Sequence, residues 1–182
     1  MEKPLLAFIL LLLYALPFGM AEQATAVENQ QRHRYRNEDY GYVVRIPFGI
    51  KIETAPPPSP NHGFRIQLTP STLLWVDASY TDDSSLPQIL ASERQILGKG
   101  CRLLTNKPTR LERQPASRMI FKCTSKKNSE ASTIITEVEA LRPDSGIKYK
   151  IALQTITTEK PPSNAAKIFN EMLAGFSLIP IK

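Results

Sequence analysis

Hydrophobic and polar positions alternate with a period of two along much of the chain. The segment Tyr40–Phe48 shows the pattern first, with Tyr42, Val44 and Ile46 pointing to one side. Such alternation is typical of a strand that buries one face against a core. Because proline donates no hydrogen bond to a neighbouring strand, Pro47 predicts that this strand ends there or lies at a sheet edge.

The same alternation, interrupted by residues typical of turns, predicts further strands along the chain. The strand over 73–80 carries the only tryptophan, Trp75, whose large apolar ring we expect to be mostly buried. The proline-rich stretch 55–61 predicts an extended surface loop. We expect the strands over residues 50–54, 62–68, 73–80, 101–105, 109–113, 117–124, 131–142 and 147–157.

Two segments follow the helical period instead. The first covers residues 84–98 and is interrupted by Glu93; the second follows Pro161-Pro162-Ser163 and ends at Gly175. Together the elements predict an α+β fold, with an antiparallel sheet and two main helices packed on it. The apolar stripes are Leu86, Ile89, Leu90, Ile96 and Leu97 in the first helix, and Ala165, Ile168, Phe169, Met172 and Leu173 in the second.

The turn sequence Pro-Asp-Ser-Gly at 143–146 predicts a hairpin between the last two strands. If Arg142 lies opposite Ile147, then Glu139 lies opposite Lys150. Opposite charges that face each other across strands stabilise a hairpin, so this register is favoured.

For the preceding hairpin, we place Thr124 opposite Ala131, which brings Arg118 opposite Glu137. Opposite charges again face each other, which supports the register. On this pairing one core face is formed by Met119, Phe121, Ile134, Val138, Tyr149, Ile151 and Leu153.

Composition and the N-terminus indicate an exported protein with one folded domain. The 182 residues carry a net charge of +6, with 42% hydrophobic and 22% charged residues. Residues 1–21 are typical of a signal peptide, with Lys3, an apolar run over 5–18 and small residues before the cut after Ala21. A membrane anchor is the alternative, but a spanning helix needs about 20 apolar residues. We expect a flexible polar leader over 22–39, a single domain over 40–182, no transmembrane segment after cleavage, and a periplasmic or secreted protein.

The two cysteines, Cys101 and Cys123, are expected to form a disulfide in an oxidising compartment. The alternatives are a metal site and a reactive thiol. A metal would need more ligands, yet the chain has only two histidines, and a reactive thiol would leave the second cysteine without a role.

Positive charge is concentrated on neighbouring strands of the second half. Such a patch could receive an acidic protein or a phospholipid surface, whereas the default interpretation is a charged, solvated face of a sheet. The pairing of Arg118 with Glu137 balances part of it and leaves Lys126 and Lys127 unpaired, so these two are candidate contacts for an acidic envelope protein. The basic run over 32–36 is interpreted as a solvated linker, and nucleic acid is not an expected partner of an exported protein. The patch comprises Arg110, Arg113, Arg118, Lys122, Lys126 and Lys127.

Catalytic motifs are scarce. The chain has no glycine-rich phosphate loop, no nucleophile elbow and no spaced metal ligands, so neither a cofactor nor a metal is expected. His62 and Asp77 could form a triad with Ser59, Ser71 or Ser79; the alternative is a turn in which the His62 ring bonds a backbone carbonyl. The candidate binding residues are His62, Trp75, Asp77, Tyr80, Lys126 and Lys127.

The order of elements resembles the PsbP-like α/β/α sandwich family, which includes an extrinsic photosystem II protein and small exported bacterial proteins. The resemblance rests on the opening segment 42–47 (Tyr-Val-Val-Arg-Ile-Pro), the entry to the central hairpins over 115–121 and the closing helix over 169–177. It implies an antiparallel sheet with packed helices and a binding or accessory role. The proline loop and the cysteine pair depart from the family pattern, and nothing points to a photosynthetic role.

These observations favour an exported, non-catalytic binding or accessory domain. The alternatives are a periplasmic inhibitor or immunity-type protein, suggested by the pI of about 9.4, the small size and the disulfide, and a small hydrolase that uses His62.

Overall fold

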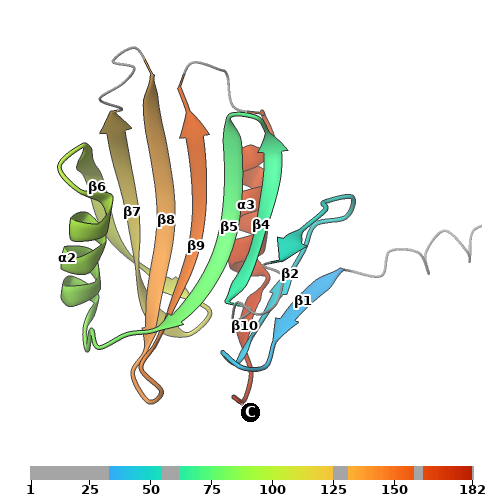
Figure 1. The fold of residues 1–182 in the computed structure, drawn as a ribbon. Coiled ribbons are helices and arrows are strands. Elements are labelled where there is room, and N and C mark those ends of the chain that lie inside the picture. Colours follow the sequence, from blue (N-terminus) through green and yellow to red (C-terminus); the bar gives the residue numbers. More distant parts are fainter. Residues whose placement is uncertain (1–32, 55–61, 125–130, 158–161, 182) are drawn as a thin grey trace, which may run out of the picture. The chain divides into compact units, whose positions relative to one another are not determined.

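Most strands of the protein join one large antiparallel sheet in the computed structural model, which describes residues 33–54, 62–124, 131–157 and 162–181. The sheet is ordered β3-β4-β5-β9-β8-β7-β6 (Figure 1). The α+β fold class, with two helices on antiparallel sheets, is confirmed. The strands are β3 (Glu53–Thr54), β4 (Gly63–Thr69), β5 (Thr72–Tyr80), β6 (Cys101–Leu111), β7 (Gln114–Thr124), β8 (Ser132–Arg142) and β9 (Ile147–Ile156).

The first predicted strand belongs to a second, smaller sheet. Here β2 (Tyr42–Arg45) lies between β1 (Arg34–Asn37) and β10 (Phe176–Leu178), and the predicted inward face of β2 is fully buried. The flexible leader expected over 22–39 is wrong for its last residues, because β1 pairs with β2 and buries Tyr35. Residues 1–32 lie outside the described part of the chain.

Each face of the large sheet is covered in part by one helix. Helix α3 (Ala165–Ala174) packs on β9 and β2, and its predicted apolar stripe is buried against one face. Helix α2 (Leu86–Leu97) contacts β8 and β6 on the other side of the sheet, as Figure 1 shows. The single predicted core face is therefore wrong: Met119 and Phe121 pack on the α2 side, whereas Val138, Tyr149 and Ile151 pack on the α3 side.

Helix α2 is rotated relative to its predicted stripe. Ile89 and Glu93 are its buried residues, whereas Ile96, which we expected to face the core, is 71% exposed. Glu93, which interrupts the apolar stripe in the sequence, thus points into the protein.

The two hairpin registers differ in outcome. The β8–β9 register is confirmed, with Glu139 opposite Lys150. The β7–β8 register is wrong by one residue, since Arg118 lies opposite Val138 rather than Glu137. Burying an apolar side chain contributes about 2 kcal/mol, whereas an exposed ion pair contributes about 0–1 kcal/mol. The observed register places apolar residues of both strands under the helices. The free energy gained by burying these side chains is larger than that of one ion pair.

Strand β6 runs without a break through Asn106-Lys107-Pro108, where we expected two short strands. Pro108 is tolerated because β6 is the edge of the sheet and has only β7 as a neighbour. The register shifts between Leu103 and Thr105, which leaves Leu104 as an extra, 42% exposed residue.

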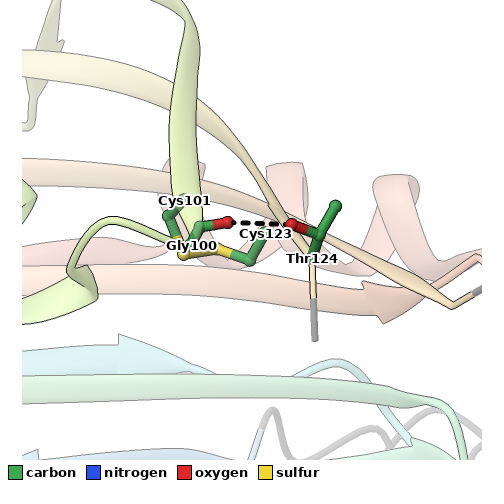
Figure 2. The surroundings of a disulfide bond; sticks show 4 residues. All are labelled: Gly100, Cys101, Cys123 and Thr124. Atoms are coloured by element: carbon green, nitrogen blue, oxygen red, sulfur yellow. Dashed lines mark hydrogen bonds between the residues drawn. A yellow bond between two sulfur atoms is a disulfide. The ribbon is translucent and has the colours of Figure 1, made fainter. Parts of the chain in front are cut away.

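The predicted disulfide is confirmed. Cys101 and Cys123 lie directly opposite each other on β6 and β7, 22 residues apart in sequence, and are bonded. Figure 2 shows the bond next to a hydrogen bond from Thr124 Oγ1 to the Gly100 carbonyl, 3.4 Å long. One disulfide and one hydrogen bond therefore fasten the start of the edge strand β6 to β7.

Replacing both cysteines with alanine is expected to lower the free energy of unfolding by about 3 kcal/mol, because the open chain regains loop entropy when it unfolds. Urea unfolding with and without dithiothreitol measures the effect in the natural protein. The double variant is the control and should not respond to the reductant. An unchanged midpoint of the natural protein in dithiothreitol would contradict the prediction.

Candidate functional site

The most unusual chemistry of the structure is a cluster of buried charges between α2 and the large sheet. Glu137 and Glu139 on β8 are 1% and 0% exposed, and Glu93 of α2 is 2% exposed. Glu137 and Glu139 are two residues apart on one strand, so both side chains point to the same face of the sheet. That face is the one that α2 covers. Glu93 of α2 lies against the two glutamates of β8.

Lys150 of β9 is the common partner of the three carboxylates. Its Nζ lies 3.0 Å from Glu139 Oε1 and 3.8 Å from Glu137 Oε2, and it donates a short hydrogen bond to Glu93. Lys148 Nζ is more remote, 3.9 Å from the second oxygen of Glu93. Lys150 therefore offsets part of the negative charge of all three carboxylates.

The cluster shifts the protonation of its members. Burial raises the pKa of Glu137 to about 8, with repulsion from Glu139 and Glu93 adding to the rise and Lys150 opposing it. Burial likewise raises the pKa of Glu139 to about 7. Burial alone would lower the pKa of Lys150, but the three glutamates raise it above its ordinary value. The lysine thus stays charged near neutral pH, where Glu137 and Glu139 titrate.

The three glutamates offer oxygens within 4.8 Å of one another, a spacing that a divalent cation could use. Glu137 Oε1 and Glu139 Oε2 make no hydrogen bond within the described part of the chain. However, the Lys150 ammonium already lies among these oxygens, and its positive charge would repel a metal ion bound there. We interpret the cluster as an ion-paired core under α2, closed to substrates by its burial.

The sequence contains a pattern that is consistent with this cluster. Glu93 interrupts an apolar stripe, and Glu137 and Glu139 repeat at the spacing of Lys148 and Lys150 on the next strand. The Glu139–Lys150 pair was predicted from the hairpin; the contact with Glu93 depends on where the helix docks.

The His62 ring bonds a backbone carbonyl, as in the alternative to the triad. Its Nδ1 lies 2.8 Å from the Ala78 carbonyl oxygen, so that nitrogen donates its proton to the backbone rather than to a carboxylate. Gly63 follows it, and a Cβ on this glycine would lie 1.9 Å from the Val76 carbonyl oxygen, so only glycine fits. Among the described residues no hydrogen bond joins His62 to Asp77, and the triad is not assembled.

The other predicted site residues that the structure describes lie on strand β5, and the Tyr40 ring packs against both His62 and Tyr80. Trp75 is partly exposed at most and packs with the apolar cluster on the α2 side of the sheet, in line with its expected burial. Asp77 of β5 lies opposite Lys150 of β9. Burial raises the pKa of Asp77, while the positive charges of His62, Lys150 and Lys148 oppose the rise. Tyr80 is 66% exposed and lies 5.5 Å, ring to ring, from Tyr40. Lys126, Lys127 and Ser59 lie outside the described residues.

Two hollows on the surface of the described residues are lined without a histidine, a cysteine or a serine. The larger, about 680 Å³, lies at the β8–β9 turn beside the C-terminal segment, and its charged residues are Arg142 and Asp144. These two form an ion pair with each other, 3.2 Å apart. The smaller, about 380 Å³, is lined by Pro108, Thr109, Arg110 and Pro115.

Positive charge dominates the described surface. Ten exposed basic residues have no ion-pair partner among the residues that the structure describes, whereas most acidic side chains are either buried or paired. None of the helices in the described ranges combines the length and apolar character needed to cross a bilayer. The ten are Arg34, Arg45, Lys51, Arg94, Lys99, Arg102, Lys107, Arg110, Arg113 and Lys122.

No protein-family model matches the sequence, and a comparison with curated proteins gives no match. Solved structures do resemble it. Cyanobacterial PsbP (CyanoP) from Synechocystis sp. PCC 6803 matches with a TM-score of 0.54 at 15% identity, over 80% of this chain and 91% of that one. The Ran-binding protein Mog1p of Saccharomyces cerevisiae matches with a TM-score of 0.57 at 10% identity, over 82% of this chain and 96% of that one.

LpqN, involved in cell envelope biogenesis of Mycobacterium tuberculosis, matches with a TM-score of 0.56 at 11% identity, over 86% of this chain and 96% of that one. Identities this low establish the fold alone. The chain has a PsbP-like fold, as the order of its elements predicted.

Proposed function

We propose that the protein is an exported, non-catalytic binding protein whose partner is an acidic protein of the cell envelope. The observation that carries the proposal is the unbalanced positive charge of the described surface, set against buried carboxylates that are paired internally. A surface of one sign attracts a partner of the other and raises the rate of encounter. The groups that could perform chemistry are closed off, since the glutamates lie under α2 and His62 is bonded to backbone.

Two further observations support this proposal. The disulfide suits an oxidising compartment outside the cytoplasm, as does the signal-like sequence over residues 1–21. Proteins of similar fold include one that is Ran-binding and one that is involved in cell envelope biogenesis, so the fold is compatible with both parts of the proposal.

Affinity capture from an envelope extract of the source cells tests the proposal. We expect the immobilised protein to retain one or a few acidic proteins, released in a salt gradient because exposed ion pairs are screened. Mass spectrometry identifies the retained proteins, and a basic bait of similar size and charge is the control. If the two baits retain the same proteins, or if purified candidates fail to bind in solution, the proposal is wrong.

A further inference from the structure

Four cations form two like-charged pairs on the outer strands of the large sheet. Arg102 of β6 lies directly opposite Lys122 of β7, and Lys107 lies directly opposite Arg118. Side chains directly opposite one another share a face of the sheet. Between the two pairs lie Thr105 and Ile120, also opposite each other, so all six side chains lie on one face. We call these six residues the cationic strip.

The strip lies on the α3 side of the sheet but beyond the helix. The neighbouring residues of β7 that point the other way, Met119 and Phe121, are buried on the α2 side. Arg118 places its guanidinium 5.5 Å from the ring centroid of Phe169 in α3, and thus marks the border of the covered area. Arg102, Lys107 and Lys122 are exposed.

Nothing within the described residues balances this charge. None of the four cations forms an ion pair there, and Arg118 faces Val138 on its other neighbouring strand. Like charges directly opposite each other destabilise a strand pair. The pairing holds because Met119 and Phe121 are buried on the opposite face and because the disulfide joins the adjacent pair of residues, Cys101 and Cys123.

We propose that the cationic strip is the docking surface for an extended, acidic segment of the protein partner. The inference rests on the proposed function and specifies where the partner binds and with which chemistry. Lys122 and Arg118 are four residues apart, about 13 Å along a strand. An extended segment with carboxylates four residues apart therefore matches both pairs, and each carboxylate relieves the repulsion within one pair.

The composition of the strip favours a protein segment over a lipid surface. Thr105 and Ile120 are half-buried between the cations, and Ile134 and Thr136 of β8 are half-buried beside them on the same face. An apolar centre with a charged rim is the usual anatomy of a protein interface. Residues recessed in a sheet face offer no side chain that would insert into a bilayer.

Charge reversal at the strip tests the inference. The variant Lys107→Glu with Lys122→Glu turns both like-charged pairs into opposite-charged pairs, and its thermal midpoint should be unchanged or raised. The matched control, Arg34→Glu with Lys51→Glu, makes the same change in net charge on exposed residues elsewhere. The probes are a peptide of alternating threonine and glutamate, the same repeat with glutamine, and vesicles of phosphatidylglycerol and phosphatidylcholine.

We expect the strip variant to bind the glutamate peptide more than tenfold more weakly, with the control variant within about twofold of the natural protein. Amide NMR shifts caused by the peptide should centre on residues 102–107 and 118–122. Equal weakening in both variants would overturn the docking surface while leaving the proposed function standing. Binding of vesicles but not peptide would assign the strip to a membrane and overturn the inference. If neither the peptide nor any captured protein binds the natural protein, the proposed function itself fails.

Discussion

Replacing Lys150 with methionine is expected to lower the free energy of unfolding by about 4 kcal/mol at neutral pH. The substitution keeps most of the apolar stem but removes the ammonium that Glu93, Glu137 and Glu139 share. Removing one partner of a buried ion pair leaves the other charge without compensation, and here three carboxylates lose their nearest cation. Urea unfolding followed by circular dichroism measures the loss.

Lys148→Met is the matched control, because Lys148 is on the same strand, is similarly buried, and reaches only Glu93, at 3.9 Å. We expect a loss of about 1 kcal/mol from it. If the two variants lose equal stability, Lys150 does not offset the charge of the cluster. A Lys150→Met variant as stable as the natural protein would contradict the prediction.

The folded protein is expected to become less stable as the pH rises from about 5 to 9. Burial raises the pKa of Glu137 to about 8 and of Glu139 to about 7, above the ordinary glutamate value of 4.5. Between the ordinary and the raised values the folded state binds more protons than the unfolded state, so the free energy of unfolding falls with increasing pH. Lys150 does not contribute in this range, because its pKa is raised and it stays protonated.

The rise in the pKa of Glu139 from 4.5 to about 7 alone corresponds to about 3 kcal/mol over this range. Urea titrations at several pH values between 5 and 9 measure it. Glu137→Gln should flatten the profile and make the protein more stable at pH 9, since an amide cannot ionise. Glu53→Gln, which changes an exposed carboxylate paired with Arg65, is the control and should keep the slope. Stability that is constant or increases across the range would contradict the prediction.

Local patterns predicted the elements whose partners are close in sequence. The β8–β9 register follows from a four-residue turn, and the stripe of α3 follows from helical spacing that the structure confirms. The β7–β8 register was wrong because an attractive contact between Arg118 and Glu137 was given more weight than the burial of Met119 and Phe121. Side-chain alternation alone cannot resolve a shift of one residue when both faces of a sheet are covered.

The sequence patterns did not predict contacts between segments that are far apart in the chain. The sequence of strand β1 is mostly polar, and Tyr35 is buried by contacts that the local pattern does not show, its pairing with β2 and its packing on Phe64. Glu93 looked like a defect in α2 because an amphipathic stripe predicts apolar partners, and its lysine partners lie more than fifty residues later in the chain. The cationic strip depended on the corrected register, since the predicted one had balanced Arg118.

Glu93 also determines how α2 can sit on the sheet. Apolar contacts such as those of Ile89 tolerate small slides of a helix, whereas a carboxylate held by Lys150 and approached by Lys148 admits one depth and one rotation. The outward position of Ile96 follows from that rotation. An all-leucine helix grafted in place of α2 would bury as much apolar area but lose its unique alignment, and would be expected to occupy several positions on the sheet.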